Sequence, residues 1–139
     1  MSALEEKNYD QRRERLLELV QERRMKALQQ ELEDMNEFDI AAFLTELGEE
    51  DQKRMATVFR LLSKERGAEV FAELDAPEQE AIINSITDKE LGDIIEDMYV
   101  DDAVDMMEEL PANIVKRVML TATPATRNLI NQYLRYPED

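Results

Sequence analysis

Apolar residues follow a regular period along most of the chain. The apolar side chains that close successive periods, twelve residues apart, are Leu62, Leu74, Ile86, Met98, Leu110, Ala122 and Leu134. Further apolar residues precede each of them by three and four positions, as Val70 and Phe71 precede Leu74. This spacing places the apolar side chains on one face of an α-helix. The pattern predicts an all-α solenoid of short helices with a ~12-residue repeat.

Small polar residues mark where these helices begin. Ser63, Asp75, Thr87 and Thr123 each stand eleven residues before a closing position, although Tyr99 and Pro111 fill that place in two units. Ser, Thr and Asp are preferred helix N-caps, and Thr87 with Glu90 has the spacing of a capping box. We therefore expect helices of about ten residues, each roughly 15 Å long.

Helices of this length are marginal in water, so they must stack on their neighbours to persist. Two twelve-residue units would then form one 24-residue structural repeat. An irregular helical bundle with accidental spacing is the alternative. Six consecutive intervals of identical length argue against it.

The first part of the chain follows a different pattern. Apolar positions with helical spacing predict one or two helices within residues 10–35. A further helix is expected from Asp39 to Leu47, ended by Gly48, and another from Glu49 to Leu62. We divide the chain into residues 1–35, N-terminal helices that cap the array, and residues 36–139, the helical-repeat superhelix.

Charge is distributed unevenly over this scaffold. Residues 36–115 carry 22 acidic and 6 basic side chains, which equals the net charge of −16 for the whole chain. Helical geometry places Asp101, Asp102, Asp105, Glu108 and Glu109 on one side of a helix whose other side is apolar. Carboxylate oxygens suit magnesium or calcium, but no EF-hand pattern is present. A solvated acidic face is the simpler alternative.

Composition excludes several classes of function. The chain has no Cys and no His, which removes thiolate metal sites, cysteine nucleophiles and the commonest general base. The acidic charge disfavours nucleic acid and anionic lipid as partners. With no evident apolar pocket to separate the pKa values of paired carboxylates, we expect no enzyme activity. The charged N-terminus lacks a signal sequence, and we expect a soluble, cytoplasmic segment.

The sequence also resembles a known family. The segments VFAELDAPEQEAIINSI, ITDKELGDIIEDM and VDDAVDMMEELPANIVKRV, together with the terminal YPED, look like the cytosolic N-terminal domain of MgtE-type magnesium transporters, from about Leu16 to Asp139. The resemblance implies a right-handed superhelix that continues into a pair of CBS domains and a five-helix membrane pore, in a homodimeric full-length protein. It places this chain on the cytoplasmic side of the membrane.

The resemblance further implies that the acidic face meets the CBS domains across bound Mg²⁺ and so favours a closed pore. Matched to the family's motifs, Glu69 of the segment AEV, Asp101 of the segment VDD and Asp105 are the expected ion contacts. Asp102 and Asp97 are added from helical geometry. Since the other ligands would lie in the following domains, we expect this chain alone to bind Mg²⁺ weakly.

Two segments depart from the family's pattern. Residues 21–24 replace a Gly-Asp turn, and residues 36–38 replace a His-Pro pair. An alternative function is a helical-repeat scaffold similar to flagellar motor switch domains, which bind partner proteins. A basic partner and no dependence on ions would distinguish this alternative.

Overall fold

The structure, a computed structural model, describes residues 2–134 and is entirely helical over that range. The helices are α1 (Ala3–Gln21), α2 (Met25–Glu33), α3 (Glu37–Glu50), α4 (Gln52–Phe59), α5 (Lys64–Ala72), α6 (Ala76–Ile83), α7 (Asp88–Asp97), α8 (Val100–Glu109), α9 (Ala112–Thr121) and α10 (Pro124–Tyr133). No helix in residues 2–134 combines the length and the apolar character that crossing a membrane requires. The terminal YPED segment lies outside the described residues.

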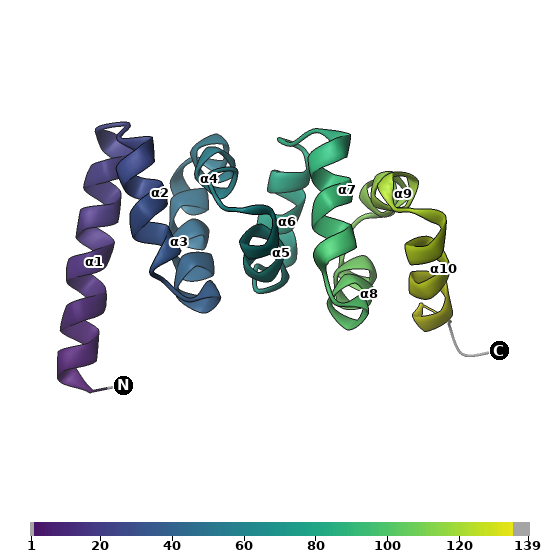
Figure 1. The fold of residues 1–139 in the computed structure, drawn as a ribbon, viewed down its shortest axis with the longest axis horizontal. Coiled ribbons are helices and arrows are strands. Elements are labelled where there is room, and N and C mark those ends of the chain that lie inside the picture. The colour runs from purple at the N-terminus through teal and green to yellow at the C-terminus, as the bar shows by residue number, and fades with distance from the viewer. Residues whose placement is uncertain (1, 135–139) are drawn as a thin grey trace.

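The helices follow one another along the long axis of an elongated array (Figure 1). Alternate helices pack on each other: α3 on α5, α5 on α7, α7 on α9, α4 on α6, and α8 on α10. Two helices, and hence about 24 residues, therefore form the repeating unit that the apolar period predicts. The all-helical prediction is confirmed, and the right-handedness of the superhelix stays a prediction.

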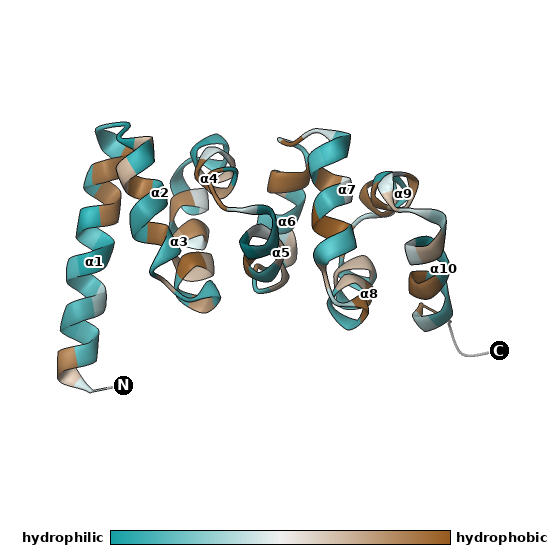
Figure 2. Ribbon diagram, in the orientation of Figure 1, coloured by the Kyte–Doolittle hydropathy of each residue, from teal (hydrophilic) through white to brown (hydrophobic). Residues whose placement is uncertain are grey.

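The apolar period corresponds to one continuous core. The closing residues Leu74, Ile86, Leu110 and Ala122 are buried, and Leu62, Met98 and Leu134 pack against the core at its edge. Each short helix thus contributes one apolar face to its neighbours, as Figure 2 shows by its alternating brown and teal turns. Burial against adjacent helices supplies the stability that a ten-residue helix lacks alone.

Most of the predicted helix starts are confirmed. The side chains of Ser63, Thr87 and Thr123 each accept a hydrogen bond from the backbone N–H three residues on, and Thr87 with Glu90 forms the full capping box. Asp75 occupies the N-cap of α6 without such a bond. Tyr99 occupies the N-cap of α8 and likewise makes no side-chain cap bond.

The predicted end of the third helix at Gly48 is wrong. Helix α3 continues to Glu50, and Asp51 caps α4 instead. A Cβ atom at Gly48 would lie 2.6 Å from the sulfur of Met55 on α4, so Gly48 lets these two helices approach closely. Gly48 lies inside α3 and does not adopt the positive φ of a glycine that ends a helix.

Arginine side chains connect helices that are distant in sequence. Arg66 on α5 donates to the backbone carbonyls of Glu33 and Met35, and Arg117 on α9 donates to those of Ile83 and Ile86. The last carbonyls of a helix lack partners within the helix. Each arginine therefore satisfies the end of an earlier helix and fixes its position in the array.

Candidate functional site

The acid-rich run of residues 88–109 divides into two parts with different roles. On α7 three carboxylates contact bases from other helices. The pairs are Asp88 with Arg117 at 3.0 Å, Glu90 with Arg60 at 2.9 Å and Asp93 with Lys64 at 3.9 Å. The acids of α7 thus help to hold the array together, and the sequence did not distinguish them from those of α8.

Glu96 on α7 also has a structural partner. Its carboxylate accepts hydrogen bonds from the backbone N–H of Thr123 at 3.1 Å and from the hydroxyl of Thr126 at 2.7 Å, at the start of α10. Burial opposes ionisation of this carboxylate, but the hydrogen bonds from Thr126 and Thr123 outweigh that effect and lower the pKa of Glu96.

Glu90 behaves in the same way. Its partial burial opposes ionisation, whereas hydrogen bonds from Arg60 and from the backbone of Thr87 lower the pKa of Glu90 below its ordinary value. Both carboxylates are therefore fully charged at neutral pH and engaged within the fold.

The carboxylates of α8 are different, because none of them has a basic partner among residues 2–134. Asp101, Asp105, Glu108 and Glu109 are exposed, and Asp102 is half-buried. The opposite side of α8 is buried through Ala103, Val104, Met106 and Met107. The predicted division of this helix into an apolar and an acidic face is confirmed.

Five acidic residues line a small hollow between α5 and the turn from α7 to α8, which we call the acidic depression. Its volume is about 110 Å³, and its lining residues are Glu37, Ala68, Glu69, Ala72, Glu73, Asp97, Met98, Tyr99 and Asp102. Arg66, 3.7 Å from Glu37, is the one base that pairs with any of these carboxylates in the described part of the chain. The hollow is smaller than the roughly 300–1,000 Å³ pockets that hold organic ligands.

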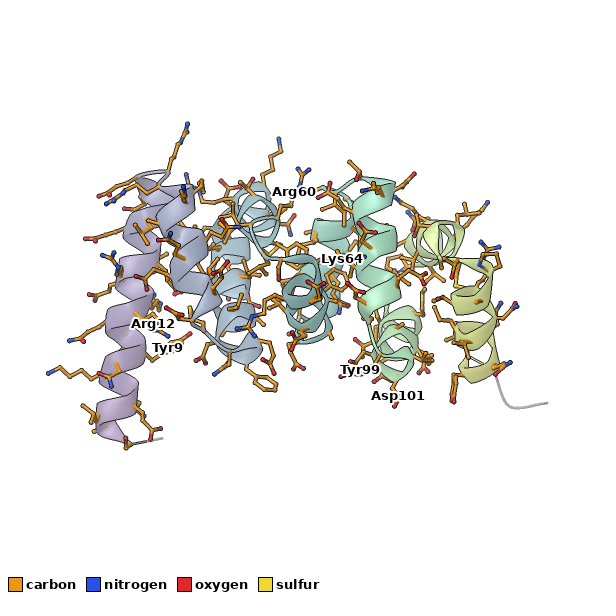
Figure 3. The ribbon with its side chains drawn as sticks, in the orientation of Figure 1. Tyr9, Arg12, Arg60, Lys64, Tyr99 and Asp101 are labelled. Carbon is orange, nitrogen blue, oxygen red and sulfur yellow. The ribbon has the colours of Figure 1, made fainter. Side chains whose placement is uncertain are left out.

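The structure brings together some of the predicted ion contacts and separates others. Glu69 on α5, Asp97 at the end of α7 and Asp102 on α8 line the acidic depression. Asp105 lines a neighbouring hollow that also includes Asp102. Asp101 lines neither, and Figure 3 shows it at the outer edge of α8, close to Tyr99. Their role as ligands stays a prediction.

Two residues of the acidic depression escaped the sequence analysis. Glu73 stands four residues after Glu69, one helical turn further along the same face, so helical spacing offered a signal for it. Glu37 precedes Glu69 by more than thirty residues and reaches the depression because α3 packs on α5. No sequence pattern indicated that contact.

The acidic depression is an open site. Across residues 2–134, no three carboxylates come close enough together to hold a metal ion. Carboxylate oxygens are nevertheless the donors that Mg²⁺ prefers, and Mg²⁺ commonly keeps several water ligands. The donor set therefore fits a hydrated Mg²⁺ ion that a second surface would have to hold as well.

A larger groove lies between the turn from α4 to α5 and helix α7, with a volume of about 210 Å³. Phe59 and Ile94 contribute to its apolar lining, and its charged residues form the pairs Arg60–Glu90 and Lys64–Asp93. Because these charges compensate each other, the groove presents no net charge to a ligand. The acidic depression is the stronger candidate.

Comparison with known proteins gives both a family and a fold. The sequence model of the family described as "MgtE intracellular N domain" matches residues 35–139. No curated protein sequence gives a match. One solved structure, "the cytosolic domain of the Mg2+ channel MgtE in complex with ATP", is 30% identical, with a TM-score of 0.73 over 89% of this chain and 50% of that one.

A second solved structure is described as "the soluble part of a magnesium transporter". It is 17% identical, with a TM-score of 0.78 over 94% of this chain and 50% of that one. At that identity the likeness concerns the fold alone. The chain spans about half the length of each of these two structures.

Proposed function

The chain belongs to the family of MgtE intracellular N domains, whose model matches residues 35–139, and on that premise we propose that it is a regulatory Mg²⁺-sensing domain of a magnesium transporter or channel. In this proposal it lies on the cytoplasmic side of the membrane. Its partners are the CBS domains and the transmembrane pore of the same full-length, homodimeric protein.

The observation that carries the proposal is the acidic depression, in which four of five acidic residues have no basic partner in the described part of the chain. Glu69, Glu73, Asp97 and Asp102 come from three helices, yet none pairs with a base in the described residues. By contrast, Asp88, Glu90 and Asp93, earlier on α7, are paired with bases. Unpaired carboxylates around one hollow repel one another, and a divalent cation would reduce that repulsion.

The mechanism follows from the incompleteness of the site. Carboxylates on this domain and on the CBS domains repel when no ion is present, and a shared Mg²⁺ ion attracts both. Mg²⁺ then favours the docked arrangement and a closed pore. The ion can shift this equilibrium only by the difference between its affinities for the docked and the undocked states.

The experiment is a Mg²⁺ titration of the chain joined to its CBS domains, with compaction followed by small-angle scattering. We expect Asp102→Asn, which removes a carboxylate from the acidic depression, to raise the Mg²⁺ midpoint by about tenfold. Glu108→Gln is the matched control, because Glu108 lies on the same helix outside both hollows. Asp101→Ala tests the residue that the family motif indicates.

The outcomes separate the alternatives. Equal midpoints for Asp102→Asn, Glu108→Gln and the wild type would remove the acidic depression as the ion site. Compaction without Mg²⁺ would favour a direct protein-interaction scaffold. For the chain alone we expect thermal stabilisation only at high Mg²⁺ concentration, since half of the ligands are absent. A near-full response at micromolar Mg²⁺ would contradict the shared-ion mechanism.

A further inference from the structure

Helix α5 lines two different hollows with its two halves. Lys64, in the first half, lines the groove between the turn from α4 to α5 and helix α7, which we call the paired groove. Glu69, in the second half, lines the acidic depression. Helix α7 is divided in the same way, with Asp93 at the paired groove and its last residue, Asp97, at the acidic depression. The two hollows therefore lie at the two ends of the contact between α5 and α7.

The charges at these two ends differ in kind. At the paired groove, the Nζ atom of Lys64 lies 3.9 Å from a carboxylate oxygen of Asp93, and Figure 3 shows Lys64 beside α7. At the acidic depression, Glu69 and Glu73 line the same hollow as Asp97, and none of the three has a basic partner in the described residues. Attraction therefore draws α5 toward α7 at the paired groove, whereas repulsion pushes the two helices apart at the acidic depression.

The middle of α5 leaves room for this helix to tilt. Gly67 is buried, yet a Cβ atom at Gly67 would have a single neighbour within 4 Å, an atom of Phe59 at 3.7 Å. No atom of α7 lies that close to it. Ala68 and Ala72, which line the acidic depression, also have small side chains. Small residues do not interlock as large ones do, so a small shear between the two helices can occur here without repacking of large side chains.

Binding of an ion at the acidic depression requires such a movement. In the described residues no three carboxylates lie close enough together to hold a metal ion. An ion that contacts carboxylates of both helices, such as Glu69 and Asp97, must therefore draw the two helices together at this end. When α5 turns as a rigid helix about its middle, its second half approaches α7 only as its first half moves away. That movement lengthens the Lys64–Asp93 pair and opens the paired groove.

We propose that the Lys64–Asp93 pair regulates ion binding, because it holds α5 tilted away from the acidic depression. This inference rests on the proposed function, which makes the acidic depression an ion site. The ion then binds against the pair, and breaking the pair raises the affinity for Mg²⁺. Since coupling between two sites is reciprocal, Mg²⁺ also weakens the pair. The two side chains are 51% and 42% exposed, and such an exposed pair changes an equilibrium by about fivefold at most.

Two substitutions break this pair and change the charge of the chain in opposite directions. Lys64→Gln removes a positive charge, and Asp93→Asn removes a negative one. We expect both to lower the Mg²⁺ midpoint by about two- to fivefold in the small-angle scattering titration of the chain joined to its CBS domains. If the substitutions acted only through the electrostatic field, Lys64→Gln would lower the midpoint and Asp93→Asn would raise it.

Matched controls remove the same charges without breaking a pair. Lys89 on α7 and Glu65 on α5 are exposed, and neither has a partner of opposite charge in the described residues. Lys89→Gln and Glu65→Gln should therefore shift the midpoint far less than the two substitutions at the pair. Circular dichroism on every variant checks that the helices persist.

A pair of cysteines measures the movement of α5 without any metal. The chain has no cysteine, so Lys64→Cys together with Asp93→Cys places two thiols across the paired groove. Adding Glu69→Gln removes repulsion at the acidic depression. We expect disulfide formation to slow by about twofold, because α5 then turns away from α7 at the paired groove. Adding Glu65→Gln instead removes a charge one helical turn earlier on α5 and should leave the rate unchanged.

The outcomes distinguish failure of this inference from failure of the proposed function. Opposite shifts for Lys64→Gln and Asp93→Asn, or shifts no larger than those of the controls, would refute regulation by the pair. The acidic depression would remain the ion site as long as Asp102→Asn raises the midpoint. Equal cross-linking rates with Glu69→Gln and Glu65→Gln would show that α5 does not move and would refute the regulation as well. Equal midpoints for Asp102→Asn and the wild type would overturn the proposed function, and the regulation with it.

Discussion

Arg23 adopts a backbone conformation that favours glycine. Its φ of 58° is the single positive value outside glycine in the described residues, at the turn between α1 and α2. The left-handed region costs an L-residue about 1–2 kcal/mol. The family resemblance described above implies a Gly-Asp turn where residues 21–24 stand in this chain. Arg23 therefore carries a side chain at a turn position where glycine would adopt the same φ without strain.

We expect Arg23→Gly to stabilise the chain by roughly 0.5–1 kcal/mol, because relief of the left-handed conformation exceeds the added flexibility of glycine in the unfolded state. Arg24→Gly is the control, since Arg24 has a negative φ. Urea unfolding of both variants measures the difference. A loss of stability in Arg23→Gly equal to that of Arg24→Gly would show that the turn stores no strain.

Single helices in this protein are held by contacts that reach well beyond the adjacent turn. Arg117 on α9 donates to the carbonyls of Ile83 and Ile86 and contacts Asp88, so one side chain connects α9 to the end of α6 and the start of α7. Arg66 on α5 makes an equivalent set of contacts at the end of α2. Stacked short helices need such connections because none of them is stable alone.

Arg117→Ala should therefore destabilise the chain by about 1.5–3 kcal/mol, the range for hydrogen bonds to a charged group. Lys116→Ala removes the neighbouring base, which has no partner in the described residues, and should change stability by less than about 0.5 kcal/mol. Thermal or urea unfolding compares the two variants. Similar effects from both would mean that the carbonyl contacts of Arg117 contribute nothing to stability.

The whole molecule is an elongated array whose charge accumulates in its middle. Asp88, Glu90 and Asp93 of α7 are paired with bases from other helices. The acids of α8 have no such pair in the described residues, and in the acidic depression only Glu37 has one. With 33 acidic and 17 basic residues, the folded chain carries more repulsion than these pairs can offset. The same unpaired charge on which the proposed ion binding depends should thus destabilise the free chain.

Monovalent salt should consequently stabilise the chain, because it screens repulsion between exposed charges beyond about 10 Å at 0.1 M. We expect the urea midpoint to rise with sodium chloride and to rise less in the Glu108→Gln variant, whose acidic face has lost one charge. A midpoint that falls with salt would indicate that the ion pairs, which salt also weakens, dominate over the repulsion.

The sequence by itself determined the features that depend on local physics. The positions of Thr87 and Thr123 indicated helix starts, and the apolar spacing from Leu62 to Leu134 indicated a stacked all-helical array. The division of α8 into an acidic and an apolar side also followed from its helical period. Each of these depends on residues within a turn or two of each other.

Only the tertiary structure decided which carboxylates are free. In the sequence, Glu90 and Asp102 belong to one acidic run, yet Glu90 pairs with Arg60, thirty residues away, and Asp102 lies in the acidic depression. Glu37 reaches the same depression through packing of α3 on α5. Such contacts depend on how helices stack across roughly 24 residues. The apolar period of one helix cannot predict these contacts. It determines on which side of the helix a residue lies, but not which residue of another helix packs opposite it.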